Sequence, residues 1–416
     1  MDNSINKIKT NKEKEFLKLS RIDLSPHYID EFIEYYSKKK NLKDKNNNLA
    51  NKIQINNQNN EKEEVYFDLA KPNDAEEIIR IIKDAFTYYP FYEMLQIGYI
   101  RGLIKSKNNY VFIFKDKQNS IVGTITFMLD LDRKKGYIRT FALYKKYWGK
   151  LNITSATISV YLYMYKKYKD QILIWYSETL TNTAKAQYIF KQCYVEPLGF
   201  FPNKDIFRNK IESEFLQVAY DRKAITQHRS KESPKIILEV MKPFIYASLK
   251  FDLISVDVTE PKIKLNRKEI LNFEKNIIIK EEEDDFGNEK VKMSFLNSDS
   301  NLTFLYTPQL KNIINIEYKT SKLEELSVFL HKLTFYIKDN ETRYCECYVS
   351  AYNPSHQKLF SHFGLKPRGY LPSWKYNKER GYFEDYILFN FFLGDIKNDF
   401  ARIEEIDLVL NHFTED

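Results

Sequence analysis

One segment of this chain recurs in its second half without a gap, and this repeat constrains the fold more than any other feature of the sequence. The identical pairs are Gln187 and Gln357, Phe190 and Phe360, Pro197 and Pro367, Gly199 and Gly369, Pro202 and Pro372, and, further along the same register, Glu214 and Glu384. Backbone geometry fixes spaced Gly and Pro residues, so convergent helix–strand texture, the alternative, explains these pairs poorly. We therefore interpret the repeat as a duplicated domain.

Hydrophobic periodicity upstream of the first copy predicts the rest of its domain. Strands are expected at 65–69, 110–114, 120–131, 137–143, 172–176 and 214–220, and helices over 74–86, 92–105, 152–168 and 182–193. This order predicts the α/β (α+β) class with an antiparallel centre. In the second half we expect strands near 295, 302–306, 313–316 and 344–350, a helix over 323–333, and the acidic run 281–285 in a loop or hairpin end.

Composition shifts divide the chain into five segments. Ser25-Pro26 and apolar residues at helical spacing predict a helix within residues 1–40. Nine of the twenty residues at 41–60 are Asn, so 41–62 is expected to be a disordered linker. We predict one copy of the duplicated domain at 63–228, a second, degenerate copy at 236–396, and a C-terminal helix or tail at 397–416.

Charge and cysteine content indicate the compartment. The net charge of +8 is mild for 416 residues, and the spread of Lys and Arg shows no basic surface, so no nucleic-acid partner is expected. Three cysteines fit a reducing compartment, and neither a signal peptide nor a membrane span is apparent. The sequence therefore predicts a soluble, cytoplasmic protein without a membrane partner.

The repeat unit resembles the C-terminal half of GNAT-superfamily N-acyltransferases. That family has an Asn, an aromatic residue seven positions later and a Gly four positions after that, and the second copy has Asn353, Phe360 and Gly364. The first copy departs from this pattern at Thr183 and Tyr194. The resemblance implies two tandem GNAT-like domains, each with a mixed, largely antiparallel sheet flanked by helices.

The family also has an acyl-CoA loop of the form R/Q-x-x-G-x-G/A between a strand and a helix, where backbone N–H groups bind the pyrophosphate. Gly149 fits its first Gly, while Trp148 replaces the Arg and Leu151 the second Gly. The resemblance implies that acetyl-CoA binds at Phe141, Ala142, Leu143, Trp148, Gly149, Lys150, Leu151, Asn152, Ile153 and Phe190. A strand–turn–helix that binds no ligand is the alternative.

The corresponding connection in the second half has no Gly. Residues 313–316 run through Glu317 to Ser321 directly into a helix. We therefore expect the second half to lack a pyrophosphate site and to act as a non-catalytic partner that shapes the substrate cleft.

In GNAT chemistry an amine attacks the thioester while a base takes its proton and an acid protonates the thiolate. Glu178, just past the fifth strand, is our first candidate for the base, and Glu212 is the second. Glu178 could equally be a surface residue that caps the next helix. Phe190 holds the usual position of the acid, so Tyr188 or Tyr176 would have to replace it.

Two other clusters have simpler interpretations. Cys345 and Cys347 with His356 and His362 could suggest zinc, but no further Cys pair supports it, and no metal is expected. The aromatic residues around Trp374 could stack on a base, although a cluster at a domain interface explains them better.

The sequence thus favours an acetyl-CoA-dependent N-acetyltransferase that acts on a primary amine of a small molecule or a protein. Tyr89-Pro90-Phe91 faintly resembles β-lysine N-acetyltransferases, which hints at a small amine. The alternatives are a non-catalytic tandem GNAT-like protein that binds CoA or another partner, and an aminoacyl-tRNA-dependent transferase.

Overall fold

The computed structural model describes residues 27–39, 63–253 and 255–396, together with Ile403, Ile406 and Leu410. The predicted cap at Ser25-Pro26, the linker 41–62 and most of the C-terminal segment 397–416 lie outside this part of the chain. Helix α2 (Ile29–Lys39) matches the expected N-terminal helix, and Phe32 on its inner face is fully buried. Within the described residues, no helix is both long and apolar enough to cross a membrane.

A single 14-stranded sheet runs through both halves of the molecule. The strands of the first half are β1 (Tyr66–Leu69), β2 (Asn109–Lys115), β3 (Ile121–Asp130), β4 (Lys135–Leu143), β5 (Ile174–Leu180), β6 (Glu196–Phe207) and β7 (Lys210–Tyr220). Those of the second half are β10 (Ile277–Glu283), β11 (Glu289–Phe295), β12 (Asn301–Thr307), β13 (Asn312–Lys319), β14 (Tyr344–Ser350), β15 (Lys366–Asn377) and β16 (Tyr382–Phe392).

The strand order reads nearly the same from either edge. It is β1-β2-β3-β4-β5-β7-β6 followed by β15-β16-β14-β13-β12-β11-β10. Within this sheet the described pairs are antiparallel except β4 with β5 and β13 with β14. The fold class predicted from the sequence, a largely antiparallel mixed sheet flanked by helices, is confirmed.

Helices cover both faces of the first half of the sheet. α5 (Ile153–Lys167) and α6 (Ala184–Gln192) contribute to a core with Phe127, Ile138 and Trp175. On the opposite face, α3 (Ala75–Phe86) and α4 (Ile97–Lys105) pack over Val111 and Ile113. Apolar residues on the two sides of β2 therefore serve two cores, which is why this strand is a nearly continuous hydrophobic run.

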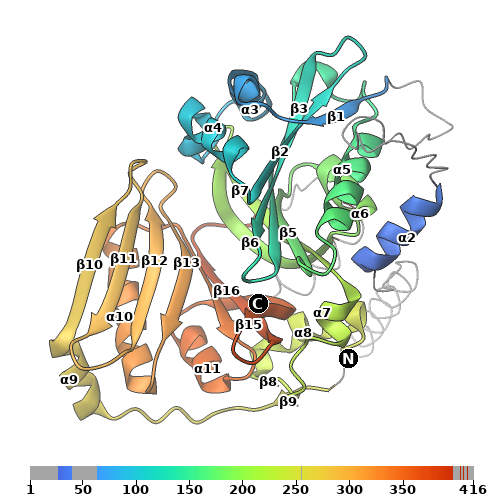
Figure 1. Cartoon of the computed structure of the whole chain (residues 1–416). Helices are drawn as coiled ribbons and strands as arrows, with labels where there is room; N and C mark the ends of the chain where they lie inside the picture. The colour runs from blue at the N-terminus through green and yellow to red at the C-terminus, as the bar shows by residue number, and fades with distance from the viewer. Residues whose placement is uncertain are drawn as a thin grey trace, which may run out of the picture.

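Within the part of the chain that the structure describes, the second half lacks one of these helical layers (Figure 1). α10 (Leu323–Asp339) and α11 (Pro354–His362) correspond to α5 and α6, but β10 leads directly into β11 through a hairpin, and α9 (Arg267–Asn276) precedes β10. The acidic run 281–285 ends β10 and enters this hairpin turn, as expected for a hairpin end. One face of the second half is consequently free to approach the first half.

The element bounds follow the register of the sequence repeat. α6 and α11, β5 and β14, and β6 and β15 each start and end at the offset that separates Gln187 from Gln357. The repeated Gly199 and Gly369 pair directly where β6 meets β15. A Cβ on Gly369 would lie 2.8 Å from the Leu198 carbonyl oxygen, so the close approach of the two strands requires glycine there. The division into domains at 63–228 and 236–396 stays a prediction.

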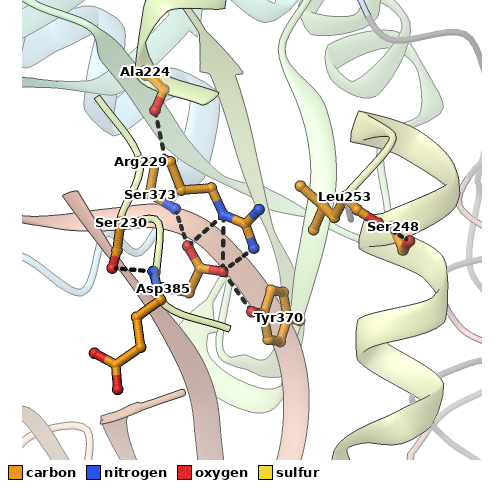
Figure 2. Close-up of polar contacts among 9 residues, drawn as sticks. Ala224, Arg229, Ser230, Ser248, Leu253, Tyr370, Ser373 and Asp385 are labelled. Atoms are coloured by element: carbon orange, nitrogen blue, oxygen red, sulfur yellow. Dashed lines mark hydrogen bonds and ion pairs between the residues drawn. The ribbon is translucent and has the colours of Figure 1, made fainter. Parts of the chain in front are cut away.

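A buried ionic cluster joins the segment after β7 to the second half (Figure 2). Asp385 is fully buried and accepts hydrogen bonds from Arg229 Nε at 3.0 Å, from the Tyr370 hydroxyl and from the Ser373 N–H at 2.8 Å. Although burial disfavours the charged guanidinium, Asp385 holds the pKa of Arg229 above its usual value. Ser373 Oγ in turn donates to the Ala224 carbonyl of α7 (Arg222–Thr226), so the cluster fixes β15 and β16 against the end of the first half.

Candidate active site

The parallel strands β4 and β5 separate near the middle of the first half. They pair from Lys135 and Ile174 to Ile138 and Ser177, and no described pair joins them beyond that point. Thr140 has a φ of 55°, and the register of β4 against β3 shifts beside it, which is the signature of a β-bulge. The two strands therefore splay apart here, and the facing edges of 139–143 and 178–180 remain open to a ligand.

The connection from β4 to α5 starts at this splay. Trp148 is exposed and its indole Nε1 donates to the Leu143 carbonyl at 2.9 Å. Gly149 has a φ of 79° with no atom within 4 Å of a Cβ placed there, so glycine is needed for the backbone conformation. Counting back three positions from Gly149 in the R/Q-x-x-G pattern puts the basic residue at Lys146, which corrects the assignment to Trp148.

Some backbone donors of this loop are already used. The Asn152 N–H donates to the Glu63 carbonyl at 2.8 Å, and the Lys150 N–H to the Tyr147 carbonyl at 3.1 Å. Asn152 caps α5 by accepting from the Ser155 N–H. The N–H groups of Gly149, Leu151, Ile153 and Thr154 have no protein acceptor among the described residues. Leu151 is buried in the core below, so its side chain does not crowd these donors.

The equivalent position in the second half is filled by the protein itself. Glu325, which the repeat register aligns with Ser155, is buried at the start of α10 and accepts from the Ser321 and Lys322 N–H groups and from two serine hydroxyls, those of Ser298 and Ser300. Burial raises the pKa of Glu325, but these hydrogen bonds hold it below its usual value. A carboxylate thus occupies the donors that an anionic ligand would need.

Two neighbouring cavities lie between the halves. Cavity 1 has a volume of about 1000 Å³ and cavity 2 of about 290 Å³. Both are lined by Tyr137, Tyr176, Glu178, Leu305, Asn315 and Glu346. Glu178 is the first residue of β5 beyond the paired region, so its carboxylate lies at the splay and borders both cavities.

Cavity 2 is also lined by the segment between α3 and α4. Pro90, Phe91, Tyr92 and Glu93 contribute to its wall. The Arg139 guanidinium lies 3.5 Å from Glu93 and 5.0 Å from the centre of the Phe91 ring. Tyr89 is buried and its hydroxyl lies 3.2 Å from Thr140 Oγ1 at the bulge. The Tyr89-Pro90-Phe91 segment is therefore fixed beside the splay.

A buried lysine organises the carboxylates at the floor of these cavities. Lys204 Nζ lies 3.1 Å from both Glu178 and Glu346. Burial disfavours the charged ammonium, but the surrounding carboxylates hold the pKa of Lys204 well above its usual value. Burial raises the pKa of Asp205 to about 7 and, with Asp205 nearby, raises the pKa of Glu214 well above its usual value. This cluster can hold or take up a proton near neutral pH.

The structure separates the tyrosines proposed from the sequence. Tyr176 lines both cavities and stacks on Tyr137, with ring centres 4.9 Å apart. Tyr188 is half-exposed on α6. Neither Tyr188 nor Glu212 of β7 lines either cavity. Phe190 is buried against Phe141 and Tyr161, so it belongs to the core beneath the splay.

The remaining aromatic and cysteine clusters from the sequence lie on β14 and β15. Trp374 packs between Tyr176 of the first half and Tyr348 of the second, which matches the expected aromatic cluster between the halves. Cys345 and Cys347 are buried in β14, and burial raises the pKa of both thiols.

Lys204, Asp205 and Glu346 were missed in the sequence. The available signal was the adjacent charged pair Lys204 and Asp205 within the largely apolar segment Glu196–Phe207. A charged residue at a buried position usually belongs to an ion pair or to a functional site. Glu346 lies between Cys345 and Cys347 on a strand, but its partner comes from the other half, which no local pattern could indicate.

Comparison with solved structures finds N-acetyltransferases that match less than half of this chain. The ribosomal-protein-S5-alanine acetyltransferase from Vibrio fischeri is 16% identical, with 39% of this chain and 96% of that chain covered, at a TM-score of 0.32. The spermidine N-acetyltransferase from Vibrio cholerae in complex with CoA and spermine is 11% identical, with coverage of 38% and 95%, also at 0.32. No protein-family model and no curated protein matches. Because these TM-scores are low, the fold assignment comes from the element order and the strand register of this chain and not from these structures.

Proposed function

We propose that this protein is an acyl-CoA-dependent N-acyltransferase of the GNAT type, which transfers an acetyl group to a primary amine. The observation that carries the proposal is the splay of β4 and β5, which has unused backbone donors on one side and a carboxylate-lined cavity on the other. Neither a cavity nor a helix start alone would support a transferase, but this combination supports the binding of a donor and an acceptor at one point.

The first half has groups that fit acetyl-CoA. The N–H groups around Gly149 and at the start of α5 suit a pyrophosphate, and Lys146 and Lys150 add positive charge. Bound acetyl-CoA would supply a thioester carbonyl for attack by the amine and a thiolate as the leaving group. The open edge of 139–143 offers backbone donors toward the developing oxyanion.

The carboxylates at the floor of the cavities provide the base. As the amine nitrogen bonds to the carbonyl carbon and the carbon–sulfur bond breaks, the amine loses a proton that Glu178 can accept directly or through water. Lys204 Nζ lies 3.1 Å from Glu178, and Asp205, with its pKa of about 7, can receive the proton from the cluster. Of the two tyrosines expected from the sequence, Tyr176 is the one that borders the splay and could protonate the thiolate.

A substitution that copies the second half tests cofactor binding. Ser155→Glu would put a carboxylate at the position that Glu325 holds in the second half, and we expect it to abolish the acetyl-CoA binding measured by calorimetry on the wild-type protein. Ser155→Gln is the matched control, because it adds nearly the same volume without charge and should keep most of the affinity.

Turnover is measured next, as release of the CoA thiol in the presence of a panel of primary amines. Acetyl-CoA binding with amine-dependent thiol release would support the transferase. If the wild-type protein does not bind acetyl-CoA, the proposal is wrong, and a non-catalytic tandem protein becomes the better interpretation.

A further inference from the structure

Cavity 1 extends from the proposed reaction site across the junction of the two halves. Lys135 and Tyr137 of β4 line it on one side, and Thr303 of β12, Glu317 of β13 and Tyr348 of β14 on the other. The second-half face is accessible because no helices intervene between β10 and β11. With about 1000 Å³, the cavity has room for a ligand much larger than a small amine.

The five cations and five carboxylates that line cavity 1 are unevenly paired. The cations that line it are Arg133, Lys135, Lys290, Lys319 and Lys375, and the carboxylates are Asp130, Glu178, Glu317, Glu346 and Glu384. Arg133 pairs with Asp130 and Glu317, while Lys204 pairs with Glu178 and Glu346. Among the described residues, the four lysines that remain have no ion-pair partner, against the single carboxylate of Glu384. These lysines therefore offer unpaired cations to an anionic group of a ligand, in a cavity whose cations and carboxylates are equal in number.

Lys135 is the most enclosed of these cations. Its Nζ lies 3.2 Å from the centre of the Trp374 ring and 5.7 Å from that of Tyr176. Burial, together with the nearby cations Arg133 and Lys375, holds the pKa of Lys135 well below its usual value. Aromatic faces attract an ammonium group but leave its hydrogen-bond donors unused, so an anion entering the cavity would gain a direct partner.

The strand register sets the spacing between Lys135 and the proposed base. Lys135 lies level with Ile174, and Glu178 follows four positions later on the neighbouring strand. At the rise of a β-strand, the two Cα positions are about 13 Å apart along the sheet. One elongated molecule can therefore reach both side chains.

We propose that cavity 1 binds the anionic end of the acyl acceptor, a carboxylate or a phosphate, at Lys135 and Lys375, while its amine lies at Glu178. That the ligand is the acceptor rests on the proposed function, but the preference for an anion can be measured without turnover. The acceptor class is thus an amine with an acidic group several atoms away, and not a polyamine.

Three probes that differ only in one terminal group test this. We would titrate 6-aminohexanoate, 6-aminohexyl phosphate and 1,6-diaminohexane into the full-length protein by calorimetry, and then assay each as an acceptor with acetyl-CoA. We expect at least one anionic probe to bind about tenfold or more tightly than the diamine. The carboxylate and phosphate arms identify which acid the cavity takes.

Lys135→Gln and Lys375→Gln test the assigned residues. Lys375 is exposed, so its variant should fold even if the one at the enclosed Lys135 does not. Lys292→Gln is the control, because Lys292 is an exposed lysine on the same strand as Lys290 but does not line the cavity. We expect each cavity variant to bind the preferred anion several-fold more weakly than the control does.

Equal or tighter binding of the diamine, or equal anion binding by the cavity variants and the control, would overturn the inference. Anion binding without acetyl transfer to any probe would instead contradict the proposed function and leave the anion site intact. The two failures can therefore be told apart.

Discussion

At the residue scale, the site depends on how buried charges share one ammonium group. Lys204 neutralises Glu178 and Glu346 at 3.1 Å, but Asp205 and Glu214 lie in the same buried region without an equally close cation among the described residues. For such carboxylates, proton uptake costs less free energy than full ionisation. The folded protein is therefore expected to bind protons that the unfolded chain releases.

This difference predicts a pH-dependent stability that Asp205→Asn should reduce. The pKa of Asp205 is about 7 in the folded protein, raised by burial, and about 4 in the unfolded chain. Between these values the folded state holds more protons, so raising the pH removes stability, by up to about 1.4 kcal/mol per pH unit. Urea denaturation from pH 5 to 8 should show Asp205→Asn gaining about 1–3 kcal/mol on the wild type at the upper end. If the free energy of unfolding falls with pH as steeply for Asp205→Asn as for the exposed control Asp285→Asn, the prediction is wrong.

Glu178→Gln tests the base directly. We expect kcat/KM to fall by about 10²–10⁴, because a neutral amide cannot accept the proton, with little change in the acetyl-CoA dissociation constant. Glu212→Gln is the control, since Glu212 was also a candidate from the sequence but lines neither cavity. Similar kinetics for both variants would remove Glu178 from the mechanism.

At this scale, sequence reasoning selected residues that line the cavities only where strand position decided the outcome. Glu178 and Tyr176 follow from the end of a strand, and both line the cavities. Tyr188 was chosen for its proximity in sequence to Phe190, but helical geometry turns it outward on α6. Lys204 and Asp205 could not be assigned, because their partners Glu346 and Asn312 come from strands of the other half.

At the scale of elements, the repeat was the most informative signal. Gly and Pro positions fixed the bounds of the helix and the two strands in each copy, and these elements keep the offset of the sequence repeat. The absence of glycine after β13 also agrees with the filled donors at the start of α10. No local pattern indicated that β5 continues to Leu180. Residues 178–180 show no hydrophobic pattern of their own and belong to the strand because they pair with β7.

Glu325→Gln should destabilise the second half without affecting the proposed cofactor site. The carboxylate accepts from two backbone N–H groups and from Ser298 and Ser300, and an amide can replace only part of this. Charge-assisted bonds of this kind suggest a loss of about 1.5–3 kcal/mol, measurable by urea denaturation at pH 7. Acetyl-CoA affinity should not change, so a weakened affinity would mean that the proposal puts the cofactor in the wrong half.

At the scale of the whole molecule, the two halves act as one sheet whose central contact is narrow. β6 and β15 meet at the Gly199–Gly369 pair, and the cluster around Asp385 supports the junction from the side. Both cavities take walls from each half, so their geometry depends on this contact. The sequence indicated two related halves, but not that their sheets would join edge to edge, because strand pairing across domains leaves no periodic signal.

Gly369→Ala tests this dependence. A Cβ at this position would lie 2.8 Å from the Leu198 carbonyl oxygen and 2.9 Å from the Gly199 Cα, both backbone atoms that cannot move aside alone. We expect the strands to separate at a cost of about 1–3 kcal/mol, seen as a lower urea midpoint. Gly98→Ala is the matched control, because a Cβ there meets no atom within 4 Å and a helical site favours alanine.

If the site spans both halves, Gly369→Ala should also raise KM for the amine more than for acetyl-CoA, since only the amine site is proposed to use the second half. A variant as stable and as active as Gly98→Ala would show that the edge contact does not shape the site.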